Sequence, residues 1–207
     1  MKKLFFNKSN TEAKGHTLKK ERGFTLVETL VAIAIFTLAI IALMSVLGSG
    51  VSDTNYAKKK MTATYLAQEG IEYIRNMRDD YSLYEISTGH NWEEFMDKIV
   101  TACATSAGCY FQDADLYSSD YMTDVSLNPC TGTACYLYYS SDTSRYSYDN
   151  SEGEITDFQR IIKVETGSST APFNSGQEIK VISTVKWTQG SGNYSISFSE
   201  NLFNWTP

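Results

Sequence analysis

An uninterrupted apolar run, residues 24–47, constrains this 207-residue chain more than any other feature. As an α-helix its 24 residues would span about 36 Å, and a bilayer core requires about 20 apolar residues. Between Thr25 and Ser52 the only ionisable residue is Glu28. The run therefore predicts a membrane-spanning helix. Glu28 needs a separate reason to be there, because a carboxylate in lipid costs about 2.5–3.5 kcal/mol.

Charge is distributed unevenly on the two sides of this run. The first 23 residues hold seven basic and two acidic side chains, a net charge of +5, whereas the rest of the chain holds 11 basic and 22 acidic side chains, a net charge of −11. Basic flanks of membrane helices stay in the cytoplasm. This predicts that residues 1–23, the basic head, lie in the cytoplasm and that the acidic part of the chain after the apolar run lies on the other side of the membrane. Because binding to phosphate backbones needs clustered Lys and Arg, we expect no direct nucleic-acid binding.

Two ordinary interpretations explain the run incompletely. A cleaved secretory signal has an apolar core of about 7–15 residues, which is shorter than this one. A plain signal anchor explains the lysine-rich head but leaves Glu28 unexplained. A third interpretation comes from the residues themselves, because residues 22–43, RGFTLVETLVAIAIFTLAIIAL, resemble the N-terminal signature of type IV pilins and type II secretion pseudopilins.

The resemblance implies how this region is used. In that family a prepilin peptidase cuts on the cytoplasmic side after a glycine, which Gly23 matches, and the new first residue, matched by Phe24, is N-methylated. A glutamate at the fifth mature position, matched by Glu28, offsets the new positive amine during filament assembly. Two such charges lower each other's desolvation cost only when they pair. The leader, residues 1–23, is longer than in the short-leader members of the family.

The resemblance also implies partners and a location. The partners are other pilin subunits, the prepilin peptidase, the inner-membrane assembly platform and membrane lipid, and no cofactor is implied. The precursor would cross the cytoplasmic membrane once with its N-terminus inside, and the assembled filament would be periplasmic or extracellular. The segments LAQEGIEYIRNMRD and VKWTQGSGNYSISFSENLFNW look like parts of minor pilins, which favours a minor subunit. The alternatives are a pseudopilin of a type II secretion or DNA-uptake system, and a membrane-anchored binding domain that never polymerises.

The helical pattern continues beyond the apolar run. Seven small or apolar residues recur at helical spacing on one face: Ala63, Leu66, Ala67, Gly70, Ile71, Ile74 and Met77. Because no proline interrupts residues 24–77, we expect one long helix over residues 24–78, membrane-spanning at 24–47 and amphipathic afterwards. Gly48 would soften it, since glycine costs about 1 kcal/mol relative to alanine in a helix. The alternative is two helices joined at residues 48–50.

The remainder of the chain predicts a short helix and a sheet. Residues 91–102 have an apolar face at helical spacing, with Asn91 as the cap, and residues 103–133 are rich in loop formers. From residue 134 the apolar period becomes two, which predicts an antiparallel sheet of four or five strands with one buried face. The expected fold class is α+β, with the long helix packed on the C-terminal sheet. The expected divisions are residues 1–23, 24–78, 79–133 and 134–207.

Four cysteines follow the apolar run: Cys103, Cys109, Cys130 and Cys135. They would lie outside the cytoplasm, where disulfides persist. Four cysteines allow three connectivities. The local pairs Cys103–Cys109 and Cys130–Cys135 are favoured, and reduced, buried thiols are the alternative. A zinc site is disfavoured because the spacings are unsuitable and His90 is the only histidine after the basic head.

No catalytic pattern stands out in the sequence. His90 is isolated, and the chain lacks G-x-S-x-G, P-loop and H-E-x-x-H motifs. Several loop acids match no EF-hand spacing and are interpreted as solvated: Asp113, Asp115, Asp120, Asp124, Asp142 and Asp149. We therefore expect a structural, non-enzymatic protein with no metal site.

Overall fold

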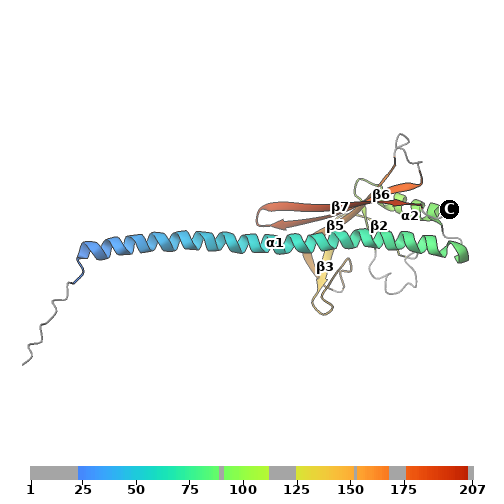
Figure 1. The fold of residues 1–207 in the computed structure, drawn as a ribbon. Coiled ribbons are helices and arrows are strands. Elements are labelled where there is room, and N and C mark those ends of the chain that lie inside the picture. The colour runs from blue at the N-terminus through green and yellow to red at the C-terminus, as the bar shows by residue number, and fades with distance from the viewer. Residues whose placement is uncertain (1–22, 89–90, 112–124, 152, 168–175, 205–207) are drawn as a thin grey trace, which may run out of the picture. The chain divides into compact units, whose positions relative to one another are not determined.

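The computed structural model describes residues 23–88, 91–111, 125–151, 153–167 and 176–204 (Figure 1). The chain divides into two compact units, residues 1–50 and residues 51–207. The first helix, α1 (Leu26–Thr88), includes residues of both units and passes through Gly48 and Gly50 without a break. The alternative of two helices joined at residues 48–50 is therefore wrong. The helix also ends later than residue 78, where the sequence predicted its end.

Tertiary packing explains the late end of α1. The polar residues 78–80 would favour the end of an isolated helix, but Tyr81 and Ser82, directly after them, are buried. The Tyr81 ring lies 5.9 Å from the ring of Phe95 in the second helix, α2 (Trp92–Cys103). This contact stabilises further turns of α1 that the local sequence does not specify.

The described residues contain a seven-stranded sheet, larger than the four or five strands predicted. Two short strands, β1 (Cys109–Phe111) and β2 (Leu127–Pro129), lie in the stretch that was expected to be loop. The other five follow residue 134 as predicted: β3 (Tyr136–Ser140), β4 (Arg145–Ser147), β5 (Glu154–Thr166), β6 (Glu178–Gln189) and β7 (Gly192–Phe203). All of their pairings are antiparallel.

β5 is the centre of this sheet. On one side it pairs with β6, which pairs in turn with β7 through a hairpin that closes at Gln189 and Gly192. On its other side β5 pairs with β3, which continues to β4, and further along with β1, which continues to β2. Within the described part of the chain, β7 pairs with β6 alone and so forms an edge of the sheet.

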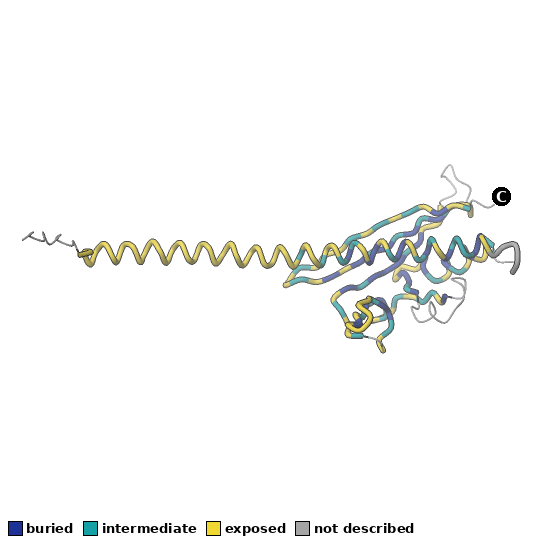
Figure 2. The backbone as a smooth tube through the Cα atoms, turned by 60° about the horizontal axis from the view of Figure 1, so that its bottom comes forward, coloured by how far each residue is buried: buried dark blue, intermediate teal, exposed yellow. Residues whose placement is uncertain are grey.

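The predicted apolar stripe of α1 packs on this sheet. All seven stripe residues are buried: Ala63, Leu66, Ala67, Gly70, Ile71, Ile74 and Met77. All of them except Gly70 share one hydrophobic core with inward-facing residues of β5 and β6: Ile162, Val164, Ile179, Val181, Val185 and Trp187. Figure 2 shows these buried segments of residues 51–207 in dark blue. The predicted α+β fold, a long helix packed on an antiparallel sheet, is confirmed.

α2 joins the same core through a cap and a disulfide. The side chain of Asn91 accepts a hydrogen bond from the Glu94 N–H at 2.9 Å, as its capping role predicts. The helix ends at Cys103, whose disulfide to Cys109 connects it to β1, with the two Cα atoms 4.7 Å apart. A second disulfide, Cys130–Cys135, spans the connection from β2 to β3 with a Cα–Cα distance of 5.4 Å. The structure thus has the local pairing that the spacing favoured.

Candidate functional site

The segment expected to carry the processing site lies directly before α1. Gly23, Phe24 and Thr25 are non-helical and exposed, and 79% of the Phe24 surface is accessible. Beyond its two chain neighbours, a Cβ built on Gly23 would meet no atom of the described residues within 4 Å. The peptide bond between Gly23 and Phe24 therefore lies in an open stretch where another protein could reach it.

Thr25 and Glu28 form the start of α1. Because the helix begins at Leu26, Thr25 is its N-cap and Glu28 its third residue, which is the spacing of a capping box. The Thr25 hydroxyl oxygen accepts a hydrogen bond from the Glu28 N–H at 3.2 Å. The Glu28 carboxylate also lies at the positive end of the helix dipole. This local role of Glu28 is additional to the assembly role expected from the sequence, and the T-x-x-E spacing is the signal that indicates it.

The carboxylate of Glu28 has no cation beside it in the described part of the chain. Glu28 is exposed, and the ion pairs found among the described residues all lie between residues 59 and 200. Gly23, Phe24 and Glu28 are thus brought together around the first turn of α1. A partner for the Glu28 charge would have to come from outside the described residues, for example from a processed N-terminus or from another molecule.

A continuous apolar surface follows Glu28. Every residue from 24 to 54 is exposed (Figure 2, yellow), and by length and composition the N-terminal part of α1 could cross a membrane. Three of its hydroxyls are satisfied inside the helix, so they need no outside partner: Thr29, Thr37 and Ser49 donate to the carbonyls of Leu26, Ala34 and Ser45. Burying one exposed Leu or Ile contributes about 1.5–3 kcal/mol. This surface therefore requires lipid or other apolar helices around it.

A buried arginine links a strand to α1 within the second unit, residues 51–207, which is called the folded unit below. Arg160 on β5 is only 1% exposed. Its Nε donates to the Tyr148 hydroxyl oxygen at 2.9 Å, and its Nη1 donates to Glu69 Oε2 at 2.5 Å and to the Leu66 carbonyl at 3.3 Å. The guanidinium carbon lies 4.6 Å from the centre of the Phe111 ring. Because a buried charge is tolerated only when it is paired, we interpret Arg160 as a structural link between β5 and α1. Arg160 was not among the residues expected from the sequence to have a role.

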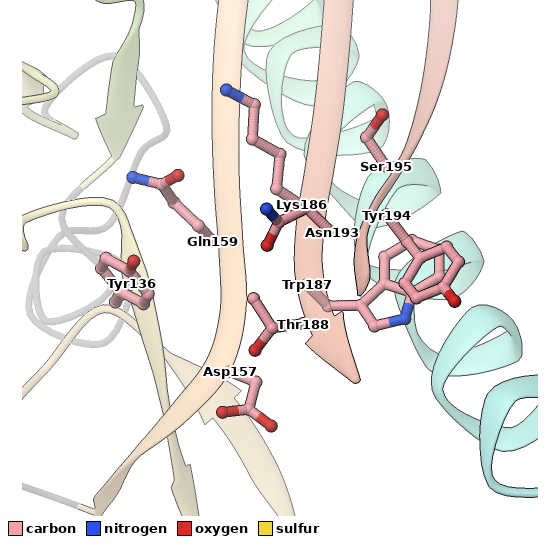
Figure 3. Close-up of a pocket in the computed structure, with 9 residues that line it drawn as sticks. All are labelled: Tyr136, Asp157, Gln159, Lys186, Trp187, Thr188, Asn193, Tyr194 and Ser195. Atoms are coloured by element: carbon pink, nitrogen blue, oxygen red, sulfur yellow. The ribbon is translucent and has the colours of Figure 1, made fainter. Parts of the chain in front are cut away.

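A pocket of about 360 Å³ adjoins the β6–β7 hairpin. Figure 3 shows Gln159, Thr188 and Asp157 on one side of β6, and Trp187 and Tyr194 together on the other side. Among the described residues that line the pocket, Asp157 is the only carboxylate. It already accepts a hydrogen bond from Lys59 Nζ at 2.6 Å, so it is not poised to act as a general base.

The structure describes only some of the acids considered as candidates and does not describe the histidine. His90 and four of the loop acids lie outside the described residues: Asp113, Asp115, Asp120 and Asp124. Asp149 accepts hydrogen bonds from the Ser151 N–H at 2.8 Å and the Ser151 hydroxyl at 2.7 Å, which lower the pKa of its carboxyl. Across the described ranges, no three His, Cys, Asp or Glu residues gather as metal ligands would.

Comparisons with known proteins point to the same N-terminal segment. Residues 18–50 match the prokaryotic N-terminal methylation motif. The chain is also 44% identical over 57 residues to type II secretion system protein I of Vibrio cholerae, an alignment that covers 28% of this chain and 49% of that protein. The chain therefore spans about half the length of this relative. No solved structure matches the present chain at a significant level.

The matched motif includes Gly23, Phe24 and Glu28, and it ends where the first structural unit ends, at residue 50. The motif and the apolar helix are consistent with a membrane-anchored protein. The architecture is pilin-like, with a long N-terminal apolar helix and an antiparallel sheet. This motif, this relative and this fold make the chain similar to pilins and pseudopilins and support a place for it among them.

Proposed function

We propose that this protein is a structural subunit, specifically a minor pilin, of a type IV pilus or a related filament, and that it is not an enzyme. The observation that carries the proposal is the combination of an exposed apolar helix with an acid, Glu28, in its first turn. The family assembles its subunits into filaments, and an apolar segment that lacks intramolecular cover suits such assembly.

Processing is the first step of the proposed function. A prepilin peptidase removes residues 1–23, and the new amine of Phe24 is then N-methylated. The open, non-helical position of the Gly23–Phe24 bond and the motif match support this step. Before processing, the precursor spans the inner membrane once with its basic leader in the cytoplasm, in agreement with the charge rule for membrane helices.

Assembly is the second step. On the assembly platform, residues 24 to about 50 leave the lipid and pack against the helices of neighbouring subunits. The Glu28 carboxylate pairs with the Phe24 amine, preferably that of a neighbour. A subunit at the wrong height would leave a charge unpaired in apolar surroundings, which costs several kcal/mol. The pair would therefore set the register between subunits, and the folded unit, residues 51–207, would form the filament surface.

A pseudopilin of a type II secretion system is the second candidate. The observation that favours it is the 44% identity to the Vibrio cholerae protein. The minor-pilin assignment rests instead on the resemblance of the segments around residues 66–79 and 185–205 to minor pilins. Deleting the gene separates the two candidates, because a minor pilin affects surface pili whereas a secretion pseudopilin affects the release of secreted proteins.

Mass spectrometry of the N-terminal peptide tests processing. We expect the mature chain to begin at Phe24 and to carry one methyl group on its amine. Gly23→Val is the informative variant, because a Cβ at this position meets no described atom within 4 Å beyond those of its chain neighbours; we therefore expect any block to arise at the peptidase. Thr25→Ser is the matched control and should be processed normally. A membrane-bound protein that keeps Met1 and never enters filaments would reject the proposal and favour the non-polymerising binding domain.

A further inference from the structure

β7 presents a long, unguarded edge. It is 12 residues long and, among the described strands, pairs only with β6. Proteins usually guard such edges with proline, charge, bulges or short length, because the unpaired N–H and C=O groups accept another strand. β7 contains no proline and registers with β6 without interruption. Its one charged side chain, Glu200, is paired with Arg75 of α1.

The hydrogen-bond pattern identifies the groups that point outward. At the end of the β6–β7 ladder opposite the hairpin, the Asn204 N–H donates to the Gln177 carbonyl at 3.0 Å. Hydrogen-bonded and non-hydrogen-bonded residue pairs alternate along an antiparallel ladder. Every second residue of β7, counted from Asn204, therefore bonds to β6. The outward groups belong to the residues in between: Asn193, Ser195, Ser197, Ser199 and Asn201. The side chains of these five residues are all exposed.

A groove of about 460 Å³ lies beside this edge, between α1 and β7. Its apolar lining includes Ile71 and Phe198, together with Tyr65, which is 65% exposed. A strand that pairs with β7 would place alternate side chains in this groove. The intervening side chains would lie on the polar outer face beside Ser195 and Ser197.

The groove is acidic. Three carboxylates line it, those of Glu69, Glu72 and Glu200, against a single arginine, Arg75. Buried Arg160 pairs with Glu69, and even when its charge is counted the groove keeps a net negative charge. Complementarity therefore favours a basic occupant. A second copy of this chain is disfavoured, because it would bring its own acidic groove to the contact.

We propose that the β7 edge, residues 193–201, together with the adjoining groove, binds an extended basic segment of another protein as an added strand. That segment has apolar residues at alternate positions facing the groove and at least one Lys or Arg beside Glu72. The nine edge residues span about 30 Å of strand. The proposal uses only residues of the folded unit 51–207, so its failure would leave the proposed filament function unaffected.

Backbone hydrogen exchange on the full chain in detergent tests this site. The probe is a synthetic nine-residue peptide of alternating valine and threonine with a lysine at each end, compared with the same peptide ending in glutamates. At about 1 mM, a concentration suited to weak binding, the lysine peptide should slow exchange at residues 193–201 at least about threefold. The glutamate peptide should slow it less.

Ser197→Pro is the discriminating variant. It removes an outward N–H and leaves the β6 ladder intact, which an edge strand tolerates, so the slowing should disappear. Ser197→Ala keeps that N–H and should retain the slowing. If Ser197→Pro does not melt cooperatively, Ser195→Pro serves the same purpose. The proposal is overturned if the lysine peptide gives no slowing, or if the proline variant responds like the alanine variant. Residues 193–201 could also exchange slowly without any peptide, and this protection could fall when the protein is diluted. That result would overturn the proposal, because it would show that a second copy of this chain occupies the edge.

Discussion

Gly70 of α1 and Ser183 of β6 bring helix and sheet into close contact, since a Cβ built on Gly70 would lie 2.4 Å from the Ser183 hydroxyl oxygen. A glycine within a helix costs about 1 kcal/mol relative to alanine, so this position needs a compensating reason, and the close approach supplies one. The Ser183 hydroxyl is buried and finds no hydrogen-bond partner among the described residues. The contact thus leaves no room for a larger helix residue at this position.

Replacing Gly70 with alanine should overpack this contact. Overpacking a core costs about 1–3 kcal/mol and alanine regains about 1 kcal/mol of helix propensity, so Gly70→Ala should lower the free energy of unfolding by up to about 2 kcal/mol, measured by chemical denaturation. Ser183→Ala removes an unsatisfied hydroxyl and should be close to neutral. The double variant should recover part of the loss, because the nearest obstructing atom is gone. A gain in stability from Gly70→Ala alone would contradict the close approach.

The link between Arg160 and Glu69 should be asymmetric. Arg160→Ala should lower the free energy of unfolding by about 3–5 kcal/mol, since it removes a buried, hydrogen-bonded charge together with its packing. Glu69→Gln leaves the buried Arg160 charge without its carboxylate but keeps an amide oxygen at the half-exposed position that can accept the hydrogen bond, so that variant should cost less, about 1–3 kcal/mol. Denaturation of both variants side by side checks this. Equal losses would show that the exposed partner matters as much as the buried one.

Asp149 should make stability depend on pH in acid. Hydrogen bonds from Ser151 lower the pKa of its carboxyl below the ordinary value. The contribution of the ionised carboxyl is therefore complete above about pH 3.9, the usual pKa of an unfolded Asp, and disappears as pH falls through the lower folded-state pKa. Asp149→Ala should lower the melting temperature near neutral pH, with a difference that shrinks in strong acid. Asn150→Ala is the neighbouring control, and its melting temperature should differ from that of the unchanged protein by the same amount at every pH.

The periodic parts of the fold could be predicted from the sequence, because burial imposes the period directly. The stripe from Ala63 to Met77 and the alternation in β6 and β7 are each repeated several times, so single exceptions do not hide them. Ser183 is such an exception, a polar residue on the buried face of β6. The local cysteine pairs could also be predicted, because their short separations limit the alternatives.

Features set by distant partners could not be predicted. β1 and β2 have three residues each, too few to show a period, and β1 depends on pairing with β5 through Cys109 and Ile162. The end of α1 depends on the contact of Tyr81 with Phe95. The buried state of Arg160 depends on groups from α1 and from the residues after β4. None of these contacts leaves a local pattern in the sequence.

Recovery of Glu28→Gln in sheared filaments tests the proposed assembly most directly. Glutamine keeps the size of the side chain and removes its charge, which leaves the Phe24 amine unpaired at a cost of about 2.5–3.5 kcal/mol. Tenfold in an equilibrium is about 1.4 kcal/mol, so filament recovery should fall by more than about tenfold, while membrane insertion and N-terminal processing stay normal. Thr25→Ala is the control, because it removes the N-cap and keeps the charge, and it should assemble nearly normally. Normal recovery of processed Glu28→Gln would contradict the charge pairing.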